Sequence, residues 1–327
     1  MSSQPDQSSD VPAQLEEMVD QGAISFETAT IYAETADAPR SLLLANSGLT
    51  HNTAPTRFVE ADRIRFAYRR FGKPSDTPIV LLQHFMGNLD NYDPAITDAL
   101  ATDREVILTD NAGVGRSEGA APETVAGMAR DAASLIDALG LEQVDLFGFS
   151  MGGFVAQQLA VDRPDLVRRL ILVGTGPRGG DGMGGLAPDV APLFGKVYDP
   201  PDLRWLPIFF SPSESSQAAG RRFLERVRAR TEDRDIPVSD ATVGAHLAAA
   251  HEWGTAARGS FDYLKEIHHP TLVVNGNNDI VVATVNSYIL QQNLPDAELI
   301  LFPDSNHGSH FQFTESFIEY LTNFVDR

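Results

Sequence analysis

The sequence of 327 residues contains no cysteine. Disulfide bonds, thiolate nucleophiles and cysteine metal ligands are therefore excluded, since each requires this side chain. His268 and His269 precede an apolar run without a nearby set of partner ligands, and we expect no metal site there. Two glycine-rich segments, residues 111–117 and 174–185, lack the spacing of dinucleotide and phosphate loops, so we expect no cofactor.

Lysine is almost absent. It occurs only at Lys73, Lys196 and Lys265, so the 25 basic residues are nearly all arginine, and 45 acidic residues give a net charge of -20. Such a surface repels nucleic acid and anionic lipid, and we expect neither as a partner. An acidic surface suits high ionic strength, where self-repulsion is screened, but the arginine bias can equally reflect genomic base composition, so the sequence leaves halophily open.

Long apolar runs are also missing. No segment approaches the roughly 20 apolar residues that cross a bilayer. No positively charged start is followed by the apolar stretch of a secretory signal. We therefore expect a cytoplasmic protein without a membrane partner.

The most informative segment that is present is Gly-Phe-Ser-Met-Gly at residues 148–152. Residues 144–147 before it are apolar enough for a buried strand, and residues 153–161 after it suit a helix. Gly-x-Ser-x-Gly occurs by chance in loops, but between a strand and a helix it predicts a tight turn that presents the serine at a helix N-terminus. Developing negative charge is favoured there, so Ser150 is predicted to be the nucleophile of an acyl transfer.

Two further polar residues follow predicted strands. Residues 271–274 and 298–302 are short apolar runs bounded by turn residues, which is typical of buried parallel strands. Asp279 and His307 lie in the loops after them. Since ligands of parallel sheets bind beyond the carboxyl ends of the strands, both are expected on the same edge as Ser150.

These residue types fit the requirements of acyl transfer. His307 would take the serine proton and return it to the leaving group, and Asp279 would hold the imidazole in the required tautomer. Asp279 could instead form an Asx turn. His310 is the competing histidine, and we interpret it as a packing residue because it begins an amphipathic final helix. Asp181 lies several residues beyond a strand end, too far to be fixed as the acid.

Together these motifs resemble the α/β-hydrolase-fold serine hydrolases, in the branch of capped esterases, lactonases and haloperoxidase-like perhydrolases. The resemblance covers roughly residues 57–325. It implies an α/β fold with a mostly parallel, doubly wound sheet and the chain order nucleophile, acid, histidine.

The resemblance also implies an oxyanion hole formed by the backbone N–H groups of Phe85 and Met151. Here the sequence departs from the family pattern, because Gln83 and His84 replace His-Gly. A side chain at residue 84 must tolerate the backbone shape that glycine adopts in relatives. We interpret His84 as a structural histidine bonded to neighbouring backbone, with substrate binding as the alternative.

An insertion is predicted before the strand at 271–274. About a hundred residues separate it from the apolar run at 170–173, far more than a βα crossover needs. We interpret residues 177–261 as a helical cap on a core of residues 56–176 and 262–327. Some apolar cap residues should line a substrate pocket, because ligand sites are mostly apolar. The candidates are Trp205, Phe209, Phe210 and Trp253.

Residues 1–55 form an N-terminal extension outside the resemblance. Residues 1–12 are polar and expected to be disordered, whereas 12–20 and 25–44 have the apolar spacing of helices. These helices must pack on the cap, the core or a second subunit, so a homodimer through the extension or the cap is one option.

The sequence thus predicts a serine hydrolase that cleaves a small-molecule carboxylic ester or lactone, with an apolar acyl or alcohol part, through an acyl-enzyme on Ser150. Two alternatives stay open. Peroxide could intercept the same acyl-enzyme, as in haloperoxidase-like perhydrolases, or the protein could be a non-catalytic ligand-binding member of the fold. A serine nucleophile argues against dehalogenases and epoxide hydrolases, which attack with a carboxylate.

Overall fold

The computed structural model describes residues 48–256 and 261–327, and the helices predicted at 12–20 and 25–44 lie outside them. An eight-stranded sheet with the strand order β1-β2-β4-β3-β5-β6-β7-β8 forms its centre. β1 and β2 pair antiparallel with their neighbours, and the remaining pairs are parallel. The strands are β1 (Arg57–Ala61), β2 (Ile64–Gly72), β3 (Ile79–Leu82), β4 (Glu105–Thr109), β5 (Val144–Phe149), β6 (Val167–Val173), β7 (Thr271–Gly276) and β8 (Ala297–Phe302).

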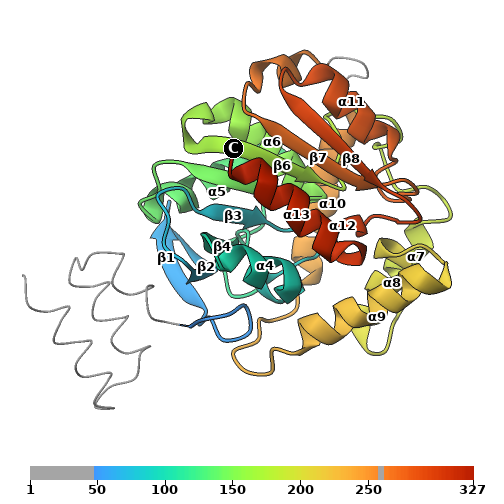
Figure 1. Ribbon diagram of the computed structural model, residues 1–327, viewed down its shortest axis with the longest axis horizontal. Helices are drawn as coiled ribbons and strands as arrows, with labels where there is room; N and C mark the ends of the chain where they lie inside the picture. Colours follow the sequence, from blue (N-terminus) through green and yellow to red (C-terminus); the bar gives the residue numbers. More distant parts are fainter. Residues whose placement is uncertain (1–47, 257–260) are drawn as a thin grey trace, which may run out of the picture.

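Alternating side chains of the central strands enter two separate cores. In β3, Val80 and Leu82 join the core under one layer of helices, whereas Ile79 and Leu81 join the other. Both faces of the sheet are therefore covered, which explains why these strands read as continuous apolar runs. The first layer contains α5 (Val125–Ala138), α6 (Met151–Asp162) and α11 (Val285–Asn293); the second contains α4 (Pro94–Ala101), α12 (Ser309–Gln312) and α13 (Thr314–Val325), which lie in front of the sheet in Figure 1. The predicted doubly wound α/β fold is confirmed.

One strand differs from its prediction. β8 is an edge strand, paired only with β7. Phe302 is its single buried residue and Leu301 is 44% exposed. The prediction of a fully buried strand at 298–302 is wrong, because a short apolar run looks the same in a central strand and in an edge strand with one covered face.

The inserted segment, defined as residues 174–270 between β6 and β7, is rich in helix in its described parts, residues 174–256 and 261–270. Its helices are α7 (Ala191–Gly195), α8 (Trp205–Phe209), α9 (Glu214–Arg228) and α10 (Asp240–Thr255), with 3-10 turns η3 (Pro201–Arg204) and η4 (Asp262–Glu266). Figure 1 shows α7, α8 and α9 grouped beside one end of the sheet. The two long helices begin at serine caps, because the Ser213 and Ser239 side chains accept hydrogen bonds from backbone N–H groups of the first turn.

The last helical region is broken. The sequence predicted one helix starting near His310, but α12 ends at Gln312 and α13 begins at Thr314, with Phe313 between them. The break lets α12 follow the loop after β8 while α13 packs along the sheet. Within residues 48–256 and 261–327, no helix combines the length and the apolar character that a bilayer crossing requires.

Candidate active site

Ser150 occupies the tight turn between β5 and α6. Its backbone has φ 55° and ψ -118°, a region that non-glycine residues rarely adopt. A Cβ atom at Gly148 would collide with the backbone of Gly152, and one at Gly152 would collide with the Leu82 carbonyl. The backbone N–H of Ser150 is fixed by a 2.9 Å bond to the Val173 carbonyl oxygen. The flanking glycines are thus required by close backbone approach, and the turn holds the serine side chain at the start of α6.

Ser150, His307 and Asp279 form one hydrogen-bonded series. The Nε2 atom of His307 lies 2.8 Å from the Ser150 Oγ, and its Nδ1 lies 2.8 Å from the Asp279 Oδ2. All three side chains are buried. Because a carboxylate only accepts, Nδ1 carries the proton and Nε2 is left to accept from the serine hydroxyl.

The carboxylate of Asp279 is itself oriented by backbone. Its Oδ1 accepts from the N–H groups of Val281 and Val282 at 2.8 and 3.0 Å. The loop after β7 therefore forms a turn around the carboxylate and directs Oδ2 to the imidazole, so the Asx turn that was the alternative role of Asp279 coexists with the histidine contact.

The two competing residues lie outside the series. Asp181 is exposed, and its backbone N–H donates to the Asn286 side chain at 2.8 Å. His310 is buried in α12 with its ring centroid 4.5 Å from that of Phe149, and burial lowers its pKa well below the ordinary value. It is a neutral packing residue, as its position before an amphipathic helix indicated.

The loop after β3, residues 83–91, carries Phe85 to the same cavity as Ser150 and Met151. Left-handed backbone occurs at Met86, with φ 63°, and not at His84. The residue that requires a left-handed backbone in this loop is therefore Met86, two positions after His84.

Gln83 is a residue whose role the sequence reasoning missed. Its Oε1 accepts from the His84 N–H at 2.9 Å, and its Nε2 donates to the Asn88 carbonyl at 3.0 Å. The buried amide thus connects the backbone at His84 with the backbone at Asn88 within this loop. The signal was available, because a long amide side chain stands where the family pattern has histidine.

His84 packs at the wall of the cavity. Its Nδ1 donates to the Phe85 carbonyl at 2.8 Å, and its ring contacts Trp205 and Phe209 edge-on at 4.8 and 5.3 Å. Burial lowers its pKa to about 3, so the imidazole is neutral, and Nε2 has no hydrogen-bond partner in the described part of the chain. The backbone contact agrees with a structural role, and the position at the wall is compatible with substrate contact.

A cavity of about 340 Å³ opens over Ser150 and His307. Trp205 and Phe209 line it, but Phe210 and Trp253 do not. Predicting these two as pocket residues was wrong. Phe210 follows the end of α8 and turns toward Phe223, at 5.9 Å, whereas Trp253 stacks on the far side of Phe154 at 5.6 Å.

Apart from His251, the remaining wall of the cavity is apolar. The apolar residues that complete the lining are Phe154, Met183, Leu186, Phe194, Ile208, Leu247, Ala250, Val281 and Val282. Among the described residues that line it there is no aspartate, glutamate, lysine or arginine. Such a surface is suited to an uncharged, largely apolar ligand.

Comparison with known proteins gives consistent results. The model of the alpha/beta hydrolase fold family matches residues 77–314. A solved alpha/beta hydrolase fold protein from Chitinophaga pinensis is similar with a TM-score of 0.80 and 43% identity, over 85% of this chain and 99% of that one. The structure of Est816, described as an N-acyl homoserine lactone degrading enzyme, is similar with a TM-score of 0.64 and 26% identity, over 82% and 100% of the two chains.

Among proteins compared by sequence, a poly(3-hydroxyalkanoate) depolymerase from Ectopseudomonas oleovorans is 30% identical over 260 residues, which cover 76% of this chain and 85% of the relative. The family match includes the turn at Ser150 and the loops that carry Asp279 and His307. On its fold, its strand order and these matches, the chain belongs to the alpha/beta hydrolase fold family of hydrolases.

Proposed function

We propose that this protein hydrolyses an uncharged carboxylic ester or lactone through an acyl-enzyme on Ser150. The observation that carries the proposal is the hydrogen-bonded series of Ser150, His307 and Asp279 at the floor of an apolar cavity. A buried serine, a histidine and a carboxylate in this order are the groups that nucleophilic acyl transfer requires.

In the first half of the reaction, the Ser150 Oγ attacks the carbonyl carbon as His307 Nε2 takes its proton. Asp279 stabilises the imidazolium that forms. The histidine then protonates the leaving alkoxide, and an ester bond to Ser150 replaces the substrate's own. In the second half, His307 deprotonates a water that attacks the acyl-enzyme, and the proton returns to Ser150 as the acid leaves.

The negative oxygen of each tetrahedral intermediate needs donors. The backbone N–H groups of Met151, at the first turn of α6, and of Phe85, in the loop held by Gln83, are the candidates, and both residues line the cavity. Charge that develops there is also favoured by the N-terminus of α6.

The substrate class follows from the wall of the cavity. A carboxylate or ammonium group would be desolvated without an aspartate, glutamate, lysine or arginine partner among the described lining residues, which is costly. The net charge of -20 further disfavours anionic substrates. The relatives named for a polyester and for a lactone fit this chemistry. We assign residues 177–261 as a cap, because Phe194, Trp205 and Leu247 of this segment supply part of the wall.

A fluorophosphonate probe tests the proposal. We expect it to label one site, on the peptide containing Ser150, and Ser150→Ala to lower the hydrolysis of neutral esters by roughly 10⁴-fold or more. Ser211→Ala is the matched control, because Ser211 is buried and its hydroxyl has no partner in the described residues. Labelling at another residue, or full activity of Ser150→Ala, would refute the proposal.

A further inference from the structure

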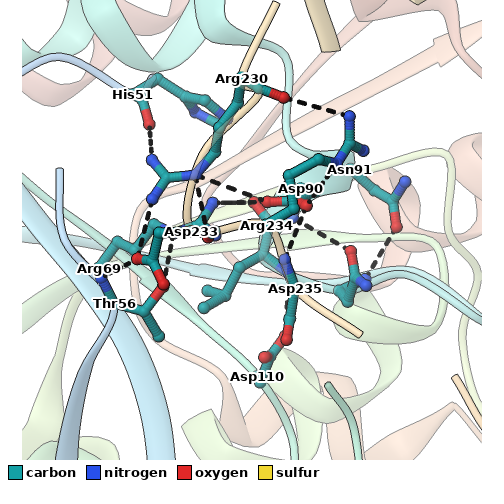
Figure 2. A network of polar contacts seen from close by, with 12 residues as sticks. His51, Thr56, Arg69, Asp90, Asn91, Asp110, Arg230, Asp233, Arg234 and Asp235 are labelled. Carbon is teal, nitrogen blue, oxygen red and sulfur yellow. Dashed lines mark hydrogen bonds and ion pairs between the residues drawn. The ribbon is translucent and has the colours of Figure 1, made fainter. Parts of the chain in front are cut away.

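A second buried polar cluster joins the inserted segment to the core (Figure 2). Arg69 of β2 is fully buried and pairs with Asp90 at 2.8 Å. Arg234 of the inserted segment reaches the same carboxylate at 3.2 Å. Arg230, also buried, pairs with Asp233 at 3.0 Å. Arginines from both sides thus neutralise Asp90 and Asp233 at this junction.

Asp110 and Asp235 behave differently. Figure 2 shows the two carboxyl groups pointing toward one another at the edge of the cluster. The facing oxygens, Oδ2 of each, are buried and have no donor in the described part of the chain. Gly115, with φ 56°, passes so close that a Cβ there would collide with both oxygens. The backbone therefore closes the space around the pair.

Two ionised carboxylates repel each other strongly when buried together, and one proton between them converts the repulsion into a hydrogen bond. Burial and the neighbouring Asp235 raise the pKa of the Asp110 carboxyl well above its usual range. Arg69 acts in the opposite direction, but it lies against Asp90. A protonated carboxyl at this position supplies the missing donor.

The pair also connects to the loop that carries Phe85. The Asp110 Oδ1 accepts from the Leu89 N–H at 2.9 Å. From the other side, the Asp235 N–H donates to the Asp90 Oδ2 at 2.9 Å, and the Asn88 side chain donates to the Ile236 carbonyl at 3.0 Å. Residues 88–90 are thus held between the end of β4 and residues 235–236 of the inserted segment.

We propose that Asp110 and Asp235 share one proton, and that this hydrogen bond positions the 83–91 loop by holding the inserted segment against it. Both are positioning residues, since neither lines the cavity over Ser150. The shared proton is independent of the proposed function, whereas its effect on turnover rests on that function.

The other groups named around the pair are held in ion pairs or are neutral. Asp90 and Asp233 are paired with arginines, and Arg116, from the loop after β4, also binds Asp233. His51, at the edge of the cluster, has its pKa lowered to about 3 by burial and by Arg69 and Arg230, so it is neutral above pH 5.

The sign of the pH effect follows from proton linkage. The folded protein holds the proton more tightly than the unfolded chain, so the stabilisation is complete below the ordinary carboxyl pKa near 4 and is lost as the pH rises through the folded value. Asp235→Asn keeps the shape of the side chain and offers Asp110 an N–H donor at every pH. The variant should therefore not lose this stabilisation as the pH rises.

The test compares melting temperatures from pH 5 to 9. We expect the Tm of Asp235→Asn minus that of wild type to rise with pH by roughly 3 °C or more. Glu232→Gln is the matched control, because Glu232 is an exposed carboxylate in the same segment. The Tm of Glu232→Gln minus that of wild type should stay constant from pH 5 to 9. A constant difference for both variants overturns the shared proton.

Infrared difference spectroscopy is the second measurement, and it needs only the wild type and one variant. Folded wild-type protein should show the carbonyl band of a protonated carboxyl at neutral pH, and Asp235→Asn or Asp110→Asn should lack it. If Asp235→Asn fails to fold, Asp110→Asn serves for both measurements. Absence of the band from the wild type overturns the proposal.

Kinetic measurements test whether the shared proton positions the 83–91 loop. The ratio of kcat of Asp235→Asn to that of wild type, on a neutral ester, should rise from pH 6 to 9, with less change in KM. A flat kcat ratio beside a rising Tm difference overturns the positioning role and leaves the shared proton. If Ser150→Ala retains activity, the proposed function has failed, while the thermal and infrared results still decide the shared proton.

Discussion

The two buried polar clusters of this protein are organised in opposite ways. At Ser150 every polar side-chain atom of the series has a complementary partner, and the Asp279 carboxylate is held by backbone N–H groups. At the junction with the inserted segment, arginines balance Asp90 and Asp233, but the facing Oδ2 atoms of Asp110 and Asp235 have no donor among the described residues.

This difference reflects where the residues come from. Ser150, Asp279 and His307 follow strands β5, β7 and β8, whose carboxyl ends meet along one edge of the sheet. The junction cluster combines β2, the loops after β3 and β4, and a segment between α9 and α10. The first cluster is placed by the sheet and the second by the docking of an insertion, so we expect the first to control turnover and the second to control stability.

The largest effect should come from Asp279→Asn. The amide keeps the size of the side chain but donates toward His307 and favours the wrong tautomer, so we expect kcat to fall by at least roughly a hundredfold with little change in KM. Steady-state kinetics on a neutral ester measure this. Asp181→Asn is the control and should cost less than about threefold. Reversed results would mean that the acid is Asp181.

The next effect concerns the junction. Arg69→Met removes a fully buried partner of Asp90 and should lower the free energy of unfolding by about 3–5 kcal/mol, because a buried charge loses its main partner. Thermal melting should show a fall in Tm of roughly 10 °C. Well below the melting point, kcat should change far less than in Asp279→Asn.

The control for Arg69 is Arg163→Met. Arg163 pairs with Asp137 and Asp165 at the surface, and its side chain is 36% exposed. Surface pairs contribute little, so its Tm should stay within about 3 °C of wild type. Equal losses in the two variants would contradict the idea that the junction cluster is a special determinant of stability.

The smallest effect should come from Asn88→Ala, which touches both regions. Asn88 donates to the Ile236 carbonyl and accepts from the Asp90 N–H as the cap of the short helix η1 (Leu89–Asn91). We expect a loss of about 1–2 kcal/mol in stability and a fall in kcat of less than roughly tenfold. Chemical denaturation and kinetics on the same samples measure the two effects.

Asn293→Ala is its control, because Asn293 donates to a backbone carbonyl of its own helix, α11, away from both clusters. It should lower stability slightly without changing kcat. If Asn88→Ala likewise left kcat unchanged, the junction cluster would not influence the 83–91 loop. The Ser150 series alone would then control turnover, and the junction cluster would control only stability.

The fold and the residues of the Ser150 series were accessible to sequence reasoning because they depend on local patterns. A buried strand, a tight glycine turn and a polar residue after a strand are each encoded within about ten residues, and parallel strands bring their carboxyl ends to a common edge. The pocket residues were harder to predict. Phe209 and Phe210 are adjacent and equally apolar, and only the end of α8 decides which of them faces the cavity.

By itself, then, the sequence determined the doubly wound sheet, the sharp turn at Ser150 and the strand ends that carry Asp279 and His307, because short apolar runs, glycine and turn residues act through short-range sterics and burial. Only the tertiary structure decided that β8 is an edge strand, that Met86 rather than His84 takes the left-handed backbone, and that Asp235 faces Asp110. The last contact joins residues 125 positions apart, and neither carboxylate carries a local sign of the other, because their proximity arises from how the inserted segment packs on the core.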